Sequence, residues 1–250
     1  MYSDSHAHVD GFTDHQMVAV LADAKAQGVD IVLGVGTTLD QSQSTIDISR
    51  RFPIIVPAVG VHPWWASPAD LEKESLFRSL ASEGNVRAIG EVGIDLVKNP
   101  STADVQWKVF ELQLGLARDL NKPVLLHCKG ARSEMQEMLR KGPSVRGVFH
   151  GFTGNAADAG GWLDLGLYIG IGVRSLTRNY TPEVEAAIRS IPLDRMLLET
   201  DASVRSFASE EALQPTKVIE VAEAVGRIHG LAPGEVGRRT TANLRALLGL

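Results

Sequence analysis

Histidines near carboxylates are the first residues in this sequence whose types and spacing suggest chemistry. His6 and His8 form a His-Ala-His motif close to the N-terminus. In an extended strand, residues i and i+2 point to the same side, so both imidazoles can converge on one metal ion. A pair of surface histidines is the alternative interpretation, because this short motif is a weak signal by itself.

Further imidazole and carboxylate groups lie in or at the ends of apolar runs. Glu91 lies within the apolar segment Ala88–Asp95, where an ionised carboxylate is costly unless it is paired or bound to a metal. A buried salt bridge is the alternative, although the neighbouring sequence offers no obvious partner. His127, His150 and Asp201 each end another apolar run. Taken singly, they could be two hydrogen-bonded core histidines and a cap or turn residue.

The runs that end in these residues belong to a regular alternation of strand-length apolar segments and segments of helical periodicity. The predicted strands are Tyr2–His8, Val29–Gly36, Ile54–His62, Val86–Asp95, Pro123–Cys128, Gly147–Phe152, Leu167–Gly172 and Met196–Asp201. The predicted helices are Asp14–Gln27, Ala103–Leu120, Ser133–Arg140, Ala156–Leu165, Pro182–Ser190, Pro215–His229 and Gly234–Leu248. Near-continuous apolar strands are typical of a parallel sheet covered on both faces. The pattern predicts an α/β fold, either a (β/α)8 TIM-type barrel or an open doubly wound sheet.

The positions of the polar residues favour the barrel. In a (β/α)8 barrel the carboxyl ends of all strands meet on one face, where active sites lie. That face would bring together His6, His8, Glu91, His127, His150 and Asp201. Such a donor set suits one or two divalent ions, such as Mg, Mn or Zn, so the sequence predicts a divalent-metal site on this face.

Length and composition limit the remaining choices. The chain has 250 residues, which suits a single domain over residues 1–250. Its formal net charge of −5 argues against binding nucleic acid by bulk charge, but not against a nucleic-acid substrate at a metal site. Cys128 is the only cysteine, so no intrachain disulfide is expected. We see no secretory signal and no apolar run that could cross a bilayer, which predicts a cytoplasmic protein without membrane association.

Six motifs resemble those of the TatD family of metal-dependent deoxyribonucleases, which are amidohydrolase-like barrels. They are Asp4-Ser5-His6-Ala7-His8, Gly60-Val61-His62-Pro63, Ile89-Gly90-Glu91-Val92-Gly93-Ile94-Asp95, Lys122-Pro123-Val124-Leu125-Leu126-His127, His150-Gly151-Phe152-Thr153-Gly154 and Leu198-Glu199-Thr200-Asp201. Asn243 near the end of the chain also fits. The motifs cover nearly the whole sequence in the order of the family, so the resemblance is specific.

The resemblance implies roles for these residues. One metal ion would be held by His6, His8 and Asp201, the other by His127 and His150, and Glu91 would bridge the two. Catalysis would depend on Asp201 and Glu91, with Asp201 accepting a proton from the attacking water. The implied activity is that of a phosphodiesterase, a 3′-5′ exodeoxyribonuclease with DNA or another phosphodiester as substrate.

Substrate contacts are implied for His62 and Lys129. Three departures from the family pattern affect the identity of the substrate. Lys129 stands where an arginine is common, Ser203 stands where a proline is common, and the segment Val204-Arg205-Ser206-Phe207 lacks the usual Gly- and Pro-rich run. Trp64 and Trp65 follow His62 and could stack on a base or simply pack in a loop. Cations near the predicted strand ends could bind phosphate or be solvated; they are Lys129, Arg132, Arg174, Arg178 and Arg205.

Two other functions remain open at this point. Related barrels hydrolyse amides, esters or lactones of small molecules, so a small-molecule hydrolase is one alternative. A TatD-like subunit of a larger complex, with a protein partner that the sequence does not identify, is the other.

Overall fold

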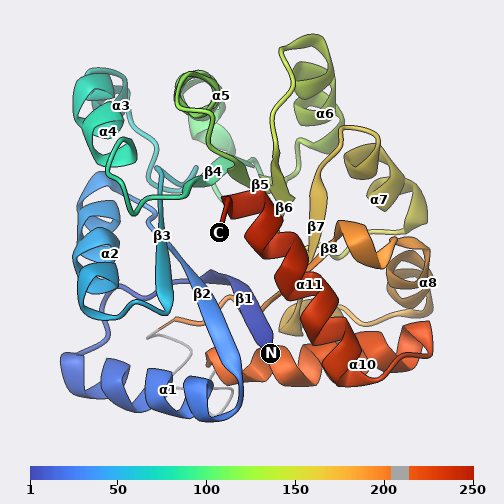
Figure 1. Ribbon diagram of the computed structural model, residues 1–250. Coiled ribbons are helices and arrows are strands. Elements are labelled where there is room, and N and C mark those ends of the chain that lie inside the picture. Colours follow the sequence, from blue (N-terminus) through green and yellow to red (C-terminus); the bar gives the residue numbers. More distant parts are fainter. Residues whose placement is uncertain (204–213) are drawn as a thin grey trace.

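The computed structural model describes residues 1–203 and 214–250. They form one sheet of eight parallel strands, in which the spatial order follows the chain order from β1 to β8 (Figure 1). The strands are β1 (Tyr2–Ala7), β2 (Val29–Val35), β3 (Ile55–Val59), β4 (Ala88–Asp95), β5 (Val124–Lys129), β6 (Gly147–Phe149), β7 (Tyr168–Gly172) and β8 (Met196–Glu199). The predicted (β/α)8 architecture is confirmed, and the open sheet is excluded.

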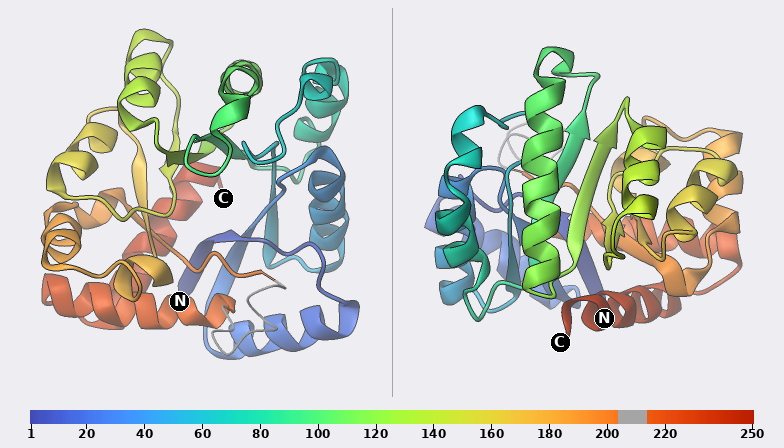
Figure 2. Two further views of the ribbon diagram at one scale, coloured as in Figure 1. Left: turned by 180° about the vertical axis from the view of Figure 1, so that it is seen from behind. Right: turned by 90° about the horizontal axis from the view of Figure 1, so that it is seen from above.

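Helices follow the strands and surround the sheet (Figure 2). The longer ones are α1 (Asp14–Ala26), α2 (Leu39–Arg51), α4 (Glu74–Ala81), α5 (Ala103–Asp119), α6 (Arg132–Lys141), α7 (Ala156–Leu163), α8 (Pro182–Ser190), α10 (Val218–His229) and α11 (Pro233–Leu248). Short helices are α3 (Pro68–Leu71), η1 (Pro100–Thr102), η2 (Val173–Leu176), η3 (Leu193–Arg195) and η4 (Pro215–Lys217). None of the described helices is both long and apolar enough to cross a membrane.

Helix α2 was not predicted from the sequence pattern. Its buried face contains Ser42, Thr45 and Ser49 beside Leu39 and Ile46. The hydroxyls of this face are satisfied by backbone carbonyls; for example, Thr45 donates to the carbonyl of Gln41 at 2.8 Å. Because hydroxyl residues count as polar in a periodicity pattern, the apolar stripe of α2 was too short to be recognised.

Two strands that lead to candidate site residues end earlier than the apolar runs suggested. β6 ends at Phe149 and β8 at Glu199. His150 and Asp201 therefore lie in the turns directly after their strands, at the end of the barrel where active sites form.

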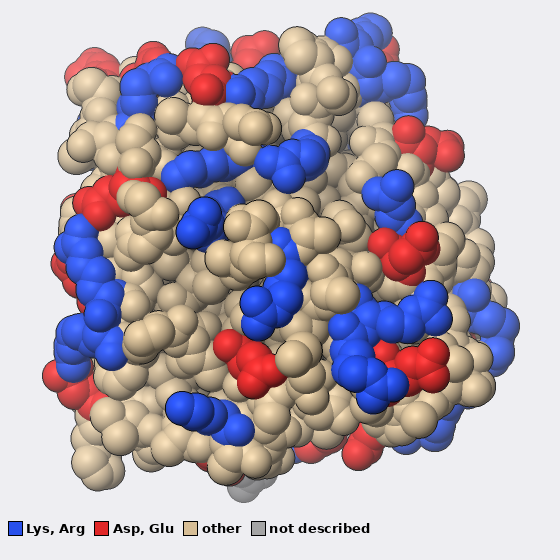
Figure 3. Space-filling model, in the orientation of Figure 1, with Lys and Arg blue, Asp and Glu red and all other residues tan. Residues whose placement is uncertain are grey.

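The opposite end of the barrel is closed by α11, which lies across it in Figure 1. Leu244, Leu247 and Leu248 of α11 pack in one buried cluster with barrel residues that include Ile31 and Ala88. Basic and acidic side chains are interspersed on this face of the molecule (Figure 3). The apolar plug leaves the other end, seen in the left view of Figure 2, for polar chemistry.

The barrel closes between β1 and β8 through a buried carboxylate. Oδ1 of Asp4 accepts hydrogen bonds from the backbone N–H of His6 at 3.2 Å and of Thr200 at 3.0 Å, and Oδ2 accepts one from the Thr200 hydroxyl at 2.5 Å. We call this junction between the first and last strands the seam. Two backbone hydrogen bonds continue it beyond β8: Asp201 N–H donates to the His6 carbonyl at 2.9 Å, and His8 N–H donates to the Ala202 carbonyl at 2.7 Å. The seam thus places Asp201 beside the two N-terminal histidines.

We expect Thr200→Val to lower the free energy of unfolding by about 1–3 kcal/mol, because the isosteric change leaves an oxygen of the buried Asp4 carboxyl without its hydroxyl donor. Urea denaturation with EDTA present measures the change. Ser82→Ala, which removes the hydroxyl of an exposed serine, is the control and should cost less than about 0.5 kcal/mol. Equal stability of Thr200→Val and the parent would show that the hydroxyl does not stabilise the seam.

Candidate metal centre

The candidate site is organised around the carboxylate of Glu91, which is 2% exposed on the fourth strand. Five imidazole nitrogens lie within 4 Å of its oxygens. The distances to Glu91 are 3.3 Å from His6 Nε2, 3.8 Å from His8 Nε2, 3.4 Å from His62 Nε2, 2.9 Å from His127 Nδ1 and 3.0 Å from His150 Nε2. Residues from strands or turns far apart in the sequence therefore meet at one point.

Asp201 completes the group on the side of the first strand. Its Oδ1 lies 3.2 Å from His8 Nε2, and its Oδ2 lies 2.5 Å from Arg174 Nη1. The backbone of Asp201 has φ 56°, in the left-handed region that residues other than glycine rarely adopt. The seam hydrogen bonds hold it there, which turns the carboxylate toward His8.

The close approach of β3 to β4 depends on a missing side chain at Gly60. A Cβ at this position would lie 2.6 Å from the carbonyl carbon of Gly90 and 2.9 Å from the nitrogen of Glu91. Only glycine fits, so the turn that carries His62 can pass directly over Glu91.

His62 lies deeper than expected for a residue that only contacts substrate. It is 4% exposed, and its donor atoms lie within 4.8 Å of those of Glu91 and His127. Lys129, the other predicted substrate contact, is exposed on the wall of the cavity above these groups. The structure thus brings His62 into the cluster and leaves Lys129 at its edge.

The pKa shifts in the cluster result from burial and from the close packing of imidazoles with carboxylates. Burial raises the pKa of the Glu91 carboxyl, but the surrounding imidazoles, His62 first, outweigh this and hold it well below its usual range. Burial lowers the pKa of His150, yet Glu199 and Glu91 raise it well above the ordinary value. Burial, followed by the charge of His150, lowers the pKa of His6. Some imidazoles thus stay neutral and keep a lone pair for a cation.

The donors fit a divalent cation. Both ring nitrogens of His6 are buried and make no hydrogen bond. Three groups of nitrogen and oxygen donors lie close enough to hold an ion; they are His6, His150 and Glu199; His6, His8 and Asp201; and His62, Glu91 and His127. Neutral imidazoles and carboxylates are the ligands that Zn and Mn accept, and carboxylates also suit Mg.

Two carboxylates support the histidines from behind. Asp95 Oδ2 lies 3.1 Å from His127 Nε2, and Glu199 Oε1 lies 3.2 Å from His150 Nδ1. Each ring therefore lies between Glu91 and a second carboxylate, which fixes its orientation. No role was expected for Asp95 from the sequence alone. Strand parity could have identified it, because Asp95 lies four residues after Glu91 on β4 and should point to the same side.

A cavity of about 1340 Å³ opens above the cluster. Its walls include Trp64, Trp65, Lys129, Arg132, Arg174 and Arg178. Arg132 forms an ion pair with Asp158, and Arg174 one with Asp201, so these two cations are not simply solvated. Cys128 is partly buried, and this burial raises its pKa to about 12. The segment 204–207, with Arg205, lies outside the described residues.

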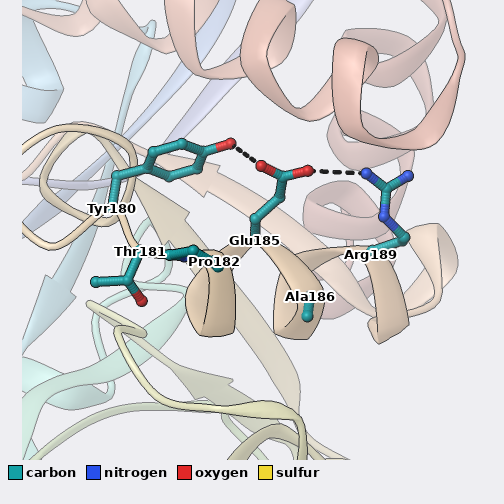
Figure 4. Close-up of a pocket in the computed structure, with 6 residues that line it drawn as sticks. All are labelled: Tyr180, Thr181, Pro182, Glu185, Ala186 and Arg189. Carbon is teal, nitrogen blue, oxygen red and sulfur yellow. Dashed lines mark hydrogen bonds and ion pairs between the residues drawn. The ribbon is translucent and has the colours of Figure 1, made fainter.

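A smaller hollow of about 280 Å³ lies beside α8 (Figure 4). Its one carboxylate, Glu185, accepts hydrogen bonds from the Tyr180 hydroxyl and, at 2.9 Å, from Arg189. The carboxylate is already balanced, and the hollow takes no part in the candidate metal centre.

Comparisons with known proteins identify the family to which the chain is similar. The family model described as "TatD related DNase" matches residues 3–249. The "Uncharacterized metal-dependent hydrolase YcfH" of Escherichia coli strain K12 is 37% identical over 256 residues, covering 98% of this chain and 94% of that protein. The "3'-5' ssDNA/RNA exonuclease TatD" of Citrobacter koseri is 32% identical over 241 residues, covering 92% of each.

Solved structures agree on the fold. The crystal structure of YjjV, a TatD homologue from Escherichia coli K12, superposes with a TM-score of 0.88 at 24% identity and covers 100% of this chain and 98% of its own. A hydrolase of the TatD family from Entamoeba histolytica gives a TM-score of 0.80 at 18% identity, covering 99% of each chain. The chain belongs to the TatD family of metal-dependent hydrolases.

Proposed function

We propose that this hydrolase is a phosphodiesterase that removes nucleotides from the 3′ end of single-stranded DNA, with the whole chain acting as one domain. The observation that carries the proposal is the convergence of five imidazoles on Glu91, with Asp201 beside His8, below an open cavity. Relatives named as 3'-5' ssDNA/RNA exonucleases support the substrate class. A location in the cytoplasm remains a prediction, and so does a protein partner.

The residues assigned to metal binding are the ones that meet at Glu91. In the proposal, His6, His8 and Asp201 would hold one ion, His127 and His150 would hold a second, and Glu91 would serve both. When bound, a divalent cation (Mg, Mn or Zn) supplies the positive charge that polarises a phosphoryl oxygen and makes a neighbouring water molecule more acidic.

Asp201 is the proposed general base. Burial raises its pKa, but the hydrogen bond from His8 and the charges of neighbouring imidazoles hold it below the usual range, so the carboxylate stays ionised. It lies at the floor of the cavity, where it can orient the attacking water and accept its proton. A positioned base of this kind contributes about 10² to 10⁴ in rate.

His62 and Lys129 are assigned to the substrate. Lys129 offers an exposed ammonium group on the cavity wall, where a phosphate of the bound strand can pair with it. His62 can donate a hydrogen bond to a phosphoryl oxygen from its place beside Glu91. Both contacts require an anionic substrate.

The metal content gives the first test. Titration calorimetry of EDTA-treated protein with Mn at pH 7.5 should show up to two ions per chain. The affinity should fall below about pH 6, because imidazoles must lose their proton to bind a cation. The raised pKa of His150 makes protons stronger competitors there. Absence of binding at pH 7.5 would disprove the metal assignment.

Three variants separate bridging, single-site and base roles. Glu91→Ala should lose both ions and all turnover, since a bridging carboxylate serves both sites. His127→Ala should retain one ion. Asp201→Asn keeps an oxygen ligand but not the base, so kcat should fall about 10² to 10⁴ while metal remains bound.

Metal stoichiometry measured beside kcat distinguishes these roles. His15→Ala, which removes an exposed histidine on α1, should change neither quantity. A Glu91→Ala protein with two ions would refute the bridge, and an Asp201→Asn protein with parental kcat would refute the base.

Substrate contacts are tested on labelled single-stranded DNA, beside a panel of small esters and amides. Lys129→Ala should raise KM about fivefold, the size of an exposed ionic contact worth about 1 kcal/mol, without loss of metal. His62→Ala should lower kcat/KM further. Lys141→Ala on α6, whose side chain is 75% exposed, is the control. If neither Lys129→Ala nor His62→Ala alters DNA cleavage, their assignments are wrong.

A further inference from the structure

Trp64 is a partly exposed aromatic residue whose ring is held at the edge of the candidate centre. It follows β3 and is 38% exposed on the wall of the cavity. Its indole Nε1 donates a hydrogen bond to Oδ2 of Asp95 at 2.6 Å, and its ring lies edge-on to His62, with 4.9 Å between the centroids. A flat apolar surface is thus fixed beside the cluster around Glu91.

The carboxylate of Asp95 connects this ring to the candidate metal centre. The oxygen that accepts from Trp64 also lies 3.1 Å from His127 Nε2. The other oxygen of Asp95 accepts hydrogen bonds from the backbone N–H groups of Val97 at 3.1 Å and Lys98 at 2.8 Å. Asp95 is held from both sides, so the ring of Trp64 is ordered before any substrate arrives, which lowers the entropy cost of stacking on it.

Positively charged side chains lie near the Trp64 ring and in the same cavity. Lys98 Nζ lies 5.7 Å from the centroid of the Trp64 ring, and Lys129 and Arg174 line the same cavity. A fixed aromatic surface with cations nearby is the arrangement that binds single-stranded nucleic acid: bases stack on the ring while phosphates pair with the cations.

On the basis of the proposed nuclease function, we infer that the Trp64 ring stacks on the base of the terminal nucleotide. The phosphate of that nucleotide then lies at the cluster around Glu91. Stacking tolerates every base, because each has a π face. Trp64 therefore selects nucleic-acid ends over phosphodiesters that carry no base. Trp65 also lines the cavity and is 51% exposed. Among the described residues, the hydrogen bond from an indole to Asp95 comes from Trp64 and not from Trp65.

The test pairs a change in the protein with a change in the substrate. The substrates are a 5′-labelled thymidine tetranucleotide and the same oligonucleotide with an abasic 3′-terminal residue. Parent, Trp64→Ala, Trp64→Phe and Trp65→Ala proteins are compared by kcat/KM on both. Binding of both oligonucleotides to EDTA-treated protein, followed by quenching of tryptophan fluorescence, gives a readout that needs no turnover.

We expect the parent to prefer the intact oligonucleotide about 10- to 100-fold, the size of one base stacked on an aromatic ring. Trp64→Ala should reduce this preference to about onefold. Trp64→Phe keeps a ring but loses the bond to Asp95, so an intermediate preference is expected. Trp65→Ala, the adjacent residue of the same type, should retain most of the preference.

The outcomes separate this inference from the proposed function. If the parent cleaves both oligonucleotides equally, or if Trp64→Ala and Trp64→Phe keep its preference, the stacking role is wrong while the nuclease function stands. If the parent cleaves neither, the nuclease function is wrong. Quenching that depends on both the terminal base and Trp64 would then still support stacking, and quenching independent of either would overturn it.

Discussion

The structure depends on one buried charge, the carboxylate of Glu91. A carboxylate that is 2% exposed in an apolar barrel is unfavourable unless positive charge or hydrogen-bond donors surround it. Five imidazoles do so within 4 Å, and they cannot all be protonated at such close range. A divalent cation would resolve this conflict, because it would balance the carboxylates while the imidazoles stay neutral. The donor set therefore supports the proposal that the cluster binds metal ions rather than forming only salt bridges.

Carboxylates behind the rings make the cluster rigid. His127 lies between Glu91 and Asp95, and His150 lies between Glu91 and Glu199. Glu199 has room because Gly170 has no side chain; a Cβ there would lie 2.2 Å from its Oε2. The N-terminal histidines are held differently, by the seam of backbone bonds between the first and last strands. Two kinds of support thus converge on one centre.

Aromatic and positively charged side chains lie at different strands around the opening of the barrel. Trp64 and Trp65 extend from the turn after β3, while Lys129 ends β5 and Arg174 follows β7. Asp95 contacts both the aromatic side and His127, and Arg174 contacts Asp201. Groups suited to binding a base and groups suited to binding a phosphate are therefore each joined to the residues proposed to hold metal.

The sequence by itself was enough to predict the barrel and six members of the candidate site, because strand parity and strand polarity are local properties. His6 and His8 share a face by their spacing, and every strand of a barrel points its carboxyl end the same way. Only the tertiary structure decided how close the groups come. It placed His62 within 3.4 Å of Glu91 and Arg174 in an ion pair with Asp201. It also gave Asp95 two side-chain partners, Trp64 and His127. It also revealed α2, whose buried hydroxyls hide its stripe. These features depend on contacts between distant segments, which no local pattern encodes.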